Sequence, residues 1–229
     1  IFLRDAIRSR CYHFDVSLEK RIGFVVPAYC CGLPSILNFF VDKLRLSGYE
    51  DQYVYLVLTC GSATGDAAGQ LGKLLGKKGI ALNAQFAVPM VDNNVTAHKI
   101  PDREEIDRRL DGAEEYIDEA CRAIRARGAG DYNRCQGALP GALTAASYPA
   151  YAFGRSTKPF VVTGACIGCG LCQEICPCGA ITLTDGRPAW TKPQCVRCLG
   201  CLHRCPAEAI HWKKPSEDRG RYRNPRVEL

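Results

Sequence analysis

The chain lacks the hallmarks of a secreted, disulfide-stabilised protein. A secretory signal places basic residues ahead of an apolar run, and the opening Ile1-Phe2-Leu3-Arg4-Asp5 has no such pattern. Disulfide scaffolds are typically small secreted domains. We therefore expect reduced cysteines and a cytoplasmic location.

The sequence also lacks a segment suited to crossing a membrane. Residues 22–41 and 135–154 carry no charge, and a spanning helix needs about 20 apolar residues. Prolines and glycines interrupt both stretches, and the first has the pattern of a strand, a loop and a helix start. We expect no membrane span.

Neither extreme charge nor an evident catalytic group is present. The charged fraction of 24% is ordinary for a folded protein, and no acid, base or nucleophile stands out. The 229 residues allow one large domain or two modest ones. Residues 1–158 carry 20 Lys/Arg and 18 Asp/Glu, against 10 and 6 in residues 159–229. The basic C-terminal third has no interleaved aromatic platform, so we expect no nucleic acid partner.

Cysteine is abundant, with 15 in the chain and nine of these in residues 159–229. Residues 166–177 and 195–206 both read C-x2-C-x2-C-x3-C-P, which makes them two copies of one repeat. Three cysteines at this spacing wrap a loop around a cubane, and the fourth begins a helix where the following proline needs no N–H. Structural zinc sites usually pair two C-x2-C knuckles across a longer loop. The repeated triple spacing therefore favours iron–sulfur ligation over zinc.

This module resembles bacterial-type ferredoxins with two [4Fe-4S] clusters, in which the fourth cysteine of each motif ligates the other cluster. The implied ligands are Cys166, Cys169, Cys172 and Cys205 for cluster A, and Cys195, Cys198, Cys201 and Cys176 for cluster B. With eight ligands assigned, we expect Cys178, His203, His211 and Trp190 to be packing residues. The resemblance also implies a small α+β unit, with strands at 160–163 and 210–213 and a hairpin turning at Asp185-Gly186.

Residues 1–128 alternate apolar strands with helical patterns. We expect strands at 21–27, 53–58 and 81–88, and helices at 33–46, 66–78 and 102–127. This alternation predicts an α/β domain with a parallel sheet. Ligands of such sheets bind beyond the carboxyl ends of the strands, where two loops carry small residues that would let a flat ring approach. The alternative for these loops is ordinary turn chemistry.

Several short motifs accompany the ferredoxin-like module. They are P-x-Y-x-x-G-L-P after one strand, T-C-G after the next, G-K-L-L-x-K-K-G, V-P-M-x-D-N and the tail at 219–225. Together the whole chain resembles the EFR-type flavodoxin–ferredoxin fusion proteins of anaerobes. The resemblance implies FMN at the two loops and electron transfer between flavin and clusters. The FMN contacts implied are Pro27, Ala28, Tyr29, Cys30, Gly32, Thr59, Cys60 and Gly61.

Two departures from that family stand out. Cys30 and Cys31 replace the aromatic residues that often follow the tyrosine, so that flavin stacking would rest on Tyr29. A phosphate-binding loop of the S/T-x-T-G-N type, which holds the FMN phosphate at a helix N-terminus, does not precede Ile22. Ile1–Ile7 looks like the second strand of a flavodoxin order 2-1-3-4-5. Our hypothesis is an incomplete flavodoxin-like sheet in a fragment lacking about 25–30 residues, which the upstream reading frame would test.

The expected organisation is a flavodoxin-like domain at 1–128, a linker at 129–158 and a two-cluster ferredoxin domain at 159–229. The linker would pack partly between the modules or act as a flexible tether. The basic tail at 213–226 would be solvated or would dock an acidic redox partner. We expect an electron carrier or small oxidoreductase that joins two clusters to FMN. The alternative is a ferredoxin with a flavin-free adaptor domain that docks a redox partner.

Overall fold

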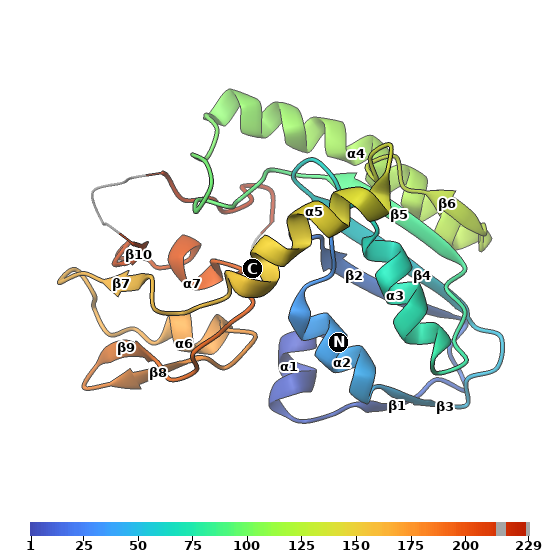
Figure 1. Ribbon diagram of the computed structural model, residues 1–229, viewed down its shortest axis with the longest axis horizontal. Helices are drawn as coiled ribbons and strands as arrows, with labels where there is room; N and C mark the ends of the chain where they lie inside the picture. Colours follow the sequence, from blue (N-terminus) through green and yellow to red (C-terminus); the bar gives the residue numbers. More distant parts are fainter. Residues whose placement is uncertain (214–218, 228–229) are drawn as a thin grey trace. The chain divides into compact units, whose positions relative to one another are not determined.

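The structure is a computed structural model that describes residues 1–213 and 219–227 (Figure 1). Its contacts divide the chain into two compact units. The first, called the α/β unit here, takes residues 11–92 and 102–154, and the second, called the C-terminal unit, takes residues 1–10, 93–101 and the described part of 155–229. These limits differ from the expected boundaries because segments distant in the sequence pack together.

The α/β unit is built on a parallel sheet with the strand order β2-β4-β5-β6. The strands span Arg21–Pro27 (β2), Tyr53–Cys60 (β4), Ala84–Pro89 (β5) and Gly130–Tyr132 (β6). Burial follows the apolar run of β4, where Val54, Leu56 and Leu58 are fully enclosed. The sequence predicted strands at the positions of β2, β4 and β5. Within this sheet, neighbouring strands follow one another in chain order. A separate parallel pair joins β1 (His13–Asp15) to β3 (Arg45–Ser47).

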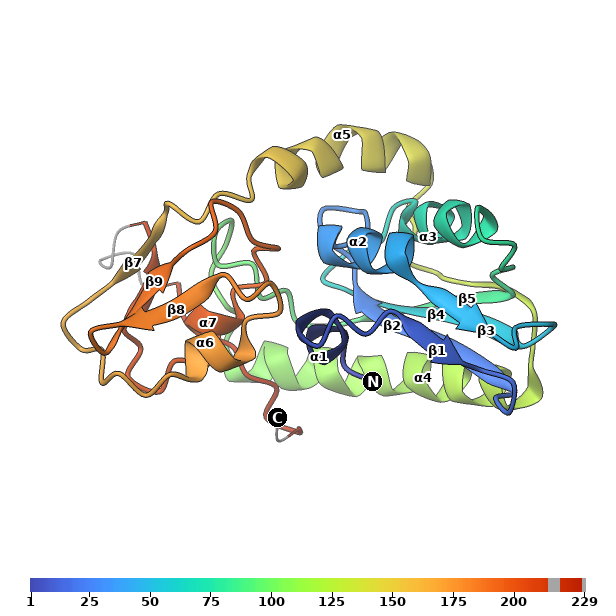
Figure 2. The same cartoon turned by 90° about the horizontal axis from the view of Figure 1, so that it is seen from below.

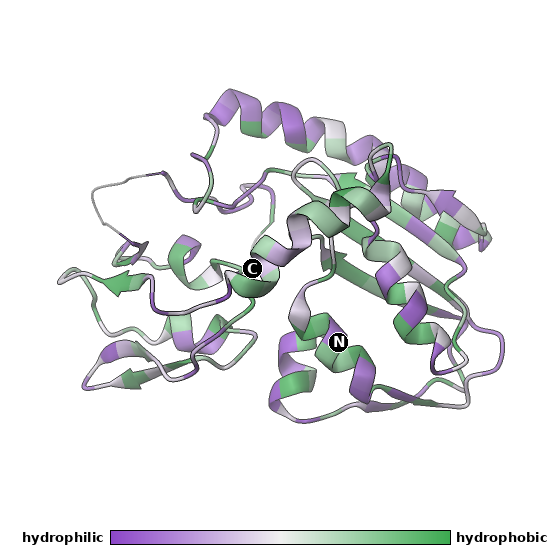
Figure 3. Ribbon diagram, in the orientation of Figure 1, coloured by the Kyte–Doolittle hydropathy of each residue, from purple (hydrophilic) through white to green (hydrophobic). Residues whose placement is uncertain are grey.

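Helices cover both faces of this sheet. Figure 2 shows α2 (Ser35–Lys43) and α3 (Ala67–Gly76) on one face and the long α4 (Arg103–Ala126) on the other. Asp102 caps α4 by accepting the N–H of Glu105 at 2.9 Å, as its spacing predicts. Figure 3 shows α4 as largely hydrophilic against the hydrophobic strands, which fits a helix with one buried face.

Residues expected to form a linker belong instead to the α/β unit. Strand β6 extends the sheet beside β5, with Phe86 opposite Tyr132 and their rings stacked 4.9 Å apart. Helix α5 spans Pro140–Phe153 and begins at a proline, whose missing N–H has no helical partner at that position. Most of residues 129–154 is therefore folded and packed within the α/β unit, and a flexible tether, the alternative considered for this segment, is not what the structure has there.

The C-terminal unit consists of short elements around a cysteine-rich core. They are β7 (Phe160–Val162), α6 (Leu171–Ile175), β8 (Ile181–Thr184), β9 (Arg187–Trp190), α7 (Gly200–His203) and β10 (Ile210–Trp212). Strands β7 and β10 pair antiparallel, and β8 and β9 form the expected hairpin. Asp185 and Gly186 both have positive φ in its turn, the geometry that favours these residue types. Trp190 stacks on Phe160 at 4.8 Å as a packing residue.

The N-terminal segment corrects one expectation. Residues Leu3–Arg8 form helix α1, not a strand. Ala6 is buried, and Arg8 donates to the carbonyl oxygens of Gln173 at 2.7 Å and Cys176 at 3.2 Å. So short a stretch does not allow periodicity to separate helix from strand, and distant contacts decide its conformation.

Among the described residues, none of the helices combines the length and the apolar character needed to cross a bilayer.

Candidate metal centre

The repeat of the cysteine motif extends to the backbone conformation. Three pairs of equivalent positions share a left-handed φ, and in each pair the first copy has glycine where the second has a side chain. The pairs are Gly168 (68°) with Arg197 (51°), Gly170 (79°) with Leu199 (58°), and Gly179 (53°) with Glu208 (49°). Non-glycine residues seldom adopt this conformation. Its recurrence shows that both motifs fold into the same loop followed by a short helix, α6 or α7.

The first group of cysteines lines a small hollow. Its lining includes Cys166, Cys169 and Cys172 of the first motif together with Cys205 of the second. Cys172 is buried in α6 and Cys169 is exposed. The structure thus brings together the four residues implied for cluster A.

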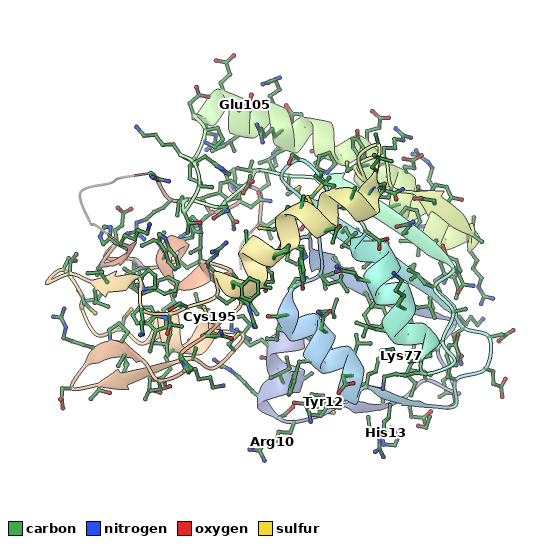
Figure 4. All side chains as sticks on the ribbon, in the orientation of Figure 1. Arg10, Tyr12, His13, Lys77, Glu105 and Cys195 are labelled. Carbon is green, nitrogen blue, oxygen red and sulfur yellow. The ribbon has the colours of Figure 1, made fainter. Side chains whose placement is uncertain are left out.

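The second group lines another small hollow. Cys195, Cys198 and Cys201 of the second motif line it together with Cys176 of the first, and Figure 4 labels Cys195 in this unit. These are the four residues implied for cluster B. Each hollow therefore combines three cysteines of one motif with the fourth of the other.

The donor arrangement bears on the kind of metal group that fits. Within residues 1–213 and 219–227, no three His, Cys, Asp or Glu side chains are placed to hold a single metal ion. Structural zinc takes four ligands at about 2.0–2.3 Å from one point. Four thiols gathered at one hollow are the donor set that an iron–sulfur cubane takes.

Backbone N–H groups point at sulfur in equivalent places of the two motifs. Ala180 N donates to Cys176 Sγ and Ala209 N donates to Cys205 Sγ, both at 3.3 Å. Ala180 and Ala209 occupy equivalent positions in the two copies of the repeat, and so do Cys176 and Cys205. Arg197 N also donates to Cys195 Sγ at 3.3 Å. Hydrogen bonds to ligand sulfur stabilise negative charge and raise the reduction potential of a cluster.

Cys178 is a fifth thiol on the wall of the second hollow. Its Sγ accepts the N–H of Val196 at 3.3 Å, and burial raises the pKa of its thiol to about 11. Its counterpart in the repeat is Ala207, which lines the first hollow. An alanine at the matching position shows that the loop geometry does not require this thiol.

His203 is a structural residue of the C-terminal unit. Its Nε2 lies 2.8 Å from the carbonyl oxygen of Asn93, and its Nδ1 accepts the N–H of Tyr222 at 3.1 Å. With Nδ1 accepting, Nε2 is the protonated nitrogen, and burial lowers the pKa of the ring so that it stays neutral. Both nitrogens are engaged, so the residue joins the 93–101 segment to the tail.

Two arginines in the described part of the basic tail form hydrogen bonds with backbone carbonyl oxygens of the unit. Arg221 donates to the carbonyl oxygens of Glu208 at 2.6 Å and Ile210 at 2.9 Å, and also to that of Leu202. Arg223 donates to the carbonyl oxygen of Arg204 at 2.9 Å, beside the C-terminus of α7, where a cation is favoured. Residues 214–218 of the predicted tail lie outside the described residues.

The residues implied for FMN lie together at the carboxyl ends of β2 and β4. Ala28 N donates to the carbonyl oxygen of Thr59 at 2.7 Å, which joins the two loops that contain Pro27, Cys60 and Gly61. Tyr29 and Gly32 exchange both backbone hydrogen bonds around a tight turn. Cys30 and Cys31 in this turn both have positive φ. The expected proximity of the loops is therefore present.

Helix α5 packs on these loops. Its Thr144 Oγ1 donates to the carbonyl oxygen of Cys31 at 2.5 Å, and its Tyr148 hydroxyl donates to that of Leu33 at 2.7 Å. The ring of Tyr29 lies 5.6 Å from that of Tyr151. A Cβ at Gly32 would overlap the ring of Tyr148. Gly32 is one of the small residues predicted to let a flat ring approach. In the structure it instead lets helix α5 of the same unit pack closely.

One family model matches the part of the chain that contains the two cysteine motifs. The model, described as a 4Fe-4S dicluster domain, matches residues 165–210. A subunit of the ion-translocating oxidoreductase complex of Methanosarcina acetivorans is 37% identical over 57 residues, 25% of this chain and 21% of its own. An uncharacterized ferredoxin of Methanocaldococcus jannaschii is 48% identical over 42 residues, 18% of this chain and 28% of its own.

A ferredoxin-like protein in the nif region of Trichormus variabilis is 33% identical over 48 residues, 20% of this chain and 41% of its own. The chain thus spans between about a fifth and two fifths of these curated relatives. No solved structure matches the chain significantly. Residues 165–210 are therefore a ferredoxin-like 4Fe-4S domain.

Proposed function

We propose that the C-terminal unit holds two [4Fe-4S] clusters and carries electrons for redox partner proteins. Cys166, Cys169, Cys172 and Cys205 hold cluster A, and Cys195, Cys198, Cys201 and Cys176 hold cluster B. The observation that carries this proposal is the pair of hollows, each lined by three cysteines of one motif and the fourth of the other.

The cofactor supplies reversible one-electron chemistry, and the protein's residues set its conditions. The eight thiolates fix the position of the metal. The N–H groups of Ala180 and Ala209 donate to the two fourth cysteines and offset the negative charge on sulfur. Arg8 secures the carbonyl oxygen of Cys176 from outside the motifs, which holds that ligand in place.

For the α/β unit we favour an adaptor that docks a redox partner without flavin. The hydrogen bonds of Thr144 and Tyr148 tie α5 to Cys31 and Leu33, and Tyr29 packs on Tyr151 of that helix. An isoalloxazine ring would have to compete with these contacts. The rival proposal, FMN stacked on Tyr29 at this edge of the sheet, requires α5 to move aside.

Metal analysis of anaerobically purified protein tests the cluster proposal. We expect about eight iron and eight sulfide per chain. Cys172→Ala removes a ligand of cluster A and Cys201→Ala a ligand of cluster B, so that each halves the iron content. Cys121→Ala, an exposed cysteine on α4, is the control and keeps all of it. Zinc in place of iron would overturn the proposal.

The flavin question has its own measurement. FMN titrated anaerobically into the cluster-loaded chain should keep its free fluorescence, because α5 covers the candidate contacts. Quenching that saturates at one FMN per chain in the parent, and that is weakened in Tyr29→Ala, would instead establish the flavin site and displace the adaptor proposal.

A further inference from the structure

The two ligand loops differ sharply in exposure despite their common backbone. The first loop is defined as residues 166–172 and the second as 195–201. Ile167 is 68% exposed, whereas its repeat partner Val196 is 4% exposed. Cys169 is exposed, and its partner Cys198 is half-buried. Because the loops share their fold, other parts of the unit must cover the second one.

Residues 155–158 provide part of that cover. Cys195 N donates to the carbonyl oxygen of Arg155 at 3.0 Å, and Thr157 N donates to that of Pro193 at 3.0 Å. An isolated bridge pairs Ser156 with Gln194. This segment therefore runs alongside the start of the second loop.

Side chains of the second loop complete its closure. Leu199 is 2% exposed, whereas the first loop has Gly170 at the matching position. The guanidinium of Arg197 lies over the ring of Trp212 at 5.9 Å, whereas the first loop has Gly168 there. The first loop lacks these two side chains, and the β8–β9 hairpin packs there instead, with Gly186 beside Gly168 and Leu183 beside Gly170.

The chemistry of the first loop indicates the kind of surface that it offers. No residue between Cys166 and Cys172 is charged, and Ile167 is its exposed apolar side chain. The preceding Gly164 and Ala165 are exposed as well. An uncharged patch of small and apolar residues allows close approach with little desolvation cost, as in the central part of a protein–protein interface.

We propose that the first loop is the surface through which the metal centre meets its electron-transfer partner, and that the second loop is closed to partners. The inference rests on the proposed two-cluster function. The partner it fits is a one-electron redox protein whose contact surface is uncharged at its centre, because Ile167 and the neighbouring glycines offer it no ion pair. Electron transfer between proteins needs close approach, and only the first of these two loops permits it.

Charge variants at matched positions test this assignment on the cluster-loaded protein. Ile167→Glu and Ile167→Lys place opposite charges on the first loop, and Gln194→Glu and Gln194→Lys place them beside the second. The probe is oxidation of the reduced protein by cytochrome c, a cationic protein, in stopped-flow. At low salt we expect Ile167→Glu to react about threefold to tenfold faster than Ile167→Lys, with the ratio approaching one at high salt. The Gln194 variants should react alike.

Two controls separate electrostatic steering of cytochrome c from a change in the reduction potential or in the ligand loop. Oxidation by benzoquinone, which is small and uncharged, should be the same in all four variants, since a change there would reveal an altered potential. Ala165 is exposed and is the repeat partner of Gln194, so Ala165→Glu and Ala165→Lys repeat the test without changing the ligand loop. An equal or larger effect at Gln194 than at Ile167 and Ala165 would overturn the inference.

Hydrogen exchange supplies a readout that does not depend on electron transfer. In the cluster-loaded chain, amides of residues 164–170 should exchange at least about tenfold faster than those of residues 194–199, because opening is easier in the more exposed loop. Equal protection would contradict the inference. Iron analysis of the same samples distinguishes this failure from a failure of the proposed function, in which the clusters themselves would be missing.

Discussion

Individual thiols of the α/β unit should differ greatly in reactivity. Burial raises the pKa of Cys60 to about 12, with Cys135 and Cys31 as neighbours, whereas Cys121 is exposed on α4. The thiolate is the reactive form. At pH 8 a thiol of pKa about 12 is ionised to about one part in ten thousand.

Alkylation followed by peptide mapping measures this difference. In native protein at pH 8, iodoacetamide should label Cys121 within minutes and leave Cys60 unlabelled. The rate at Cys60 should rise with pH up to about pH 12, because its ionised fraction rises in that direction. After unfolding in denaturant both should react alike. Rapid native labelling of Cys60 would refute its burial.

Cys178 should be dispensable for binding metal. Replacing it with alanine reproduces the residue found at position 207, its repeat partner on the wall of the first hollow. We expect Cys178→Ala to keep the full iron content, while Cys176→Ala loses about half. Because Cys178 is partly buried, the variant should unfold about 1 kcal/mol more easily. Halved iron in Cys178→Ala would make it a ligand.

At the scale of elements, α5 depends on a close approach that one glycine permits. The Tyr148 ring is held by its hydroxyl hydrogen bond to the carbonyl oxygen of Leu33, so it cannot readily move away from a Cβ at Gly32, which would overlap it. Gly32→Ala should therefore destabilise the α/β unit by about 1–3 kcal/mol, measured by denaturant unfolding.

A matched glycine in the same unit is the control for that variant. Gly72 lies inside α3, and apart from its chain neighbours and the backbone of its own helix nothing lies within 4 Å of a Cβ built there. Gly72→Ala should stabilise the unit by about 0.5–1 kcal/mol, the usual gain in a helix interior. If Gly32→Ala behaved like Gly72→Ala, α5 would not rest on the 27–34 loop.

At the scale of the whole chain, the C-terminal unit depends on residues far from its motifs. Arg8 holds the carbonyl oxygens of Gln173 and Cys176. Its side chain is exposed, so each hydrogen bond contributes modestly. Arg8→Ala should release iron to a chelator roughly fivefold faster, the equivalent of about 1 kcal/mol. Arg10→Ala, which removes the same charge nearby, should release iron at the parent rate.

Charge at this scale also changes when metal binds. Residues 159–229 have a formal charge of +4 from 10 basic and 6 acidic residues. An oxidised [4Fe-4S] core with four thiolates carries about −2, so two clusters would bring the total to about zero. The basic residues would then offset the negative charge of the clusters. Two of them, Arg221 and Arg223, also donate hydrogen bonds to backbone carbonyl oxygens of the same unit.

Local sequence alone was enough for several features of this protein. The cysteine spacing indicated the ferredoxin domain, the apolar runs located β2, β4 and β5, and Asp102 with Glu105 marked the start of α4. Each of these depends on neighbours within a few residues, where spacing and side-chain type fix the chemistry.

Only the tertiary structure decided the remaining features. The helical state of Leu3–Arg8, the packing of α5 on Gly32 and the position of His203 between Asn93 and Tyr222 all rest on contacts between residues far apart in the chain. The same holds for exposure, since Ile167 and Val196 occupy equivalent places in two copies of one cysteine motif. A motif specifies how a loop binds metal, whereas distant segments determine what covers it.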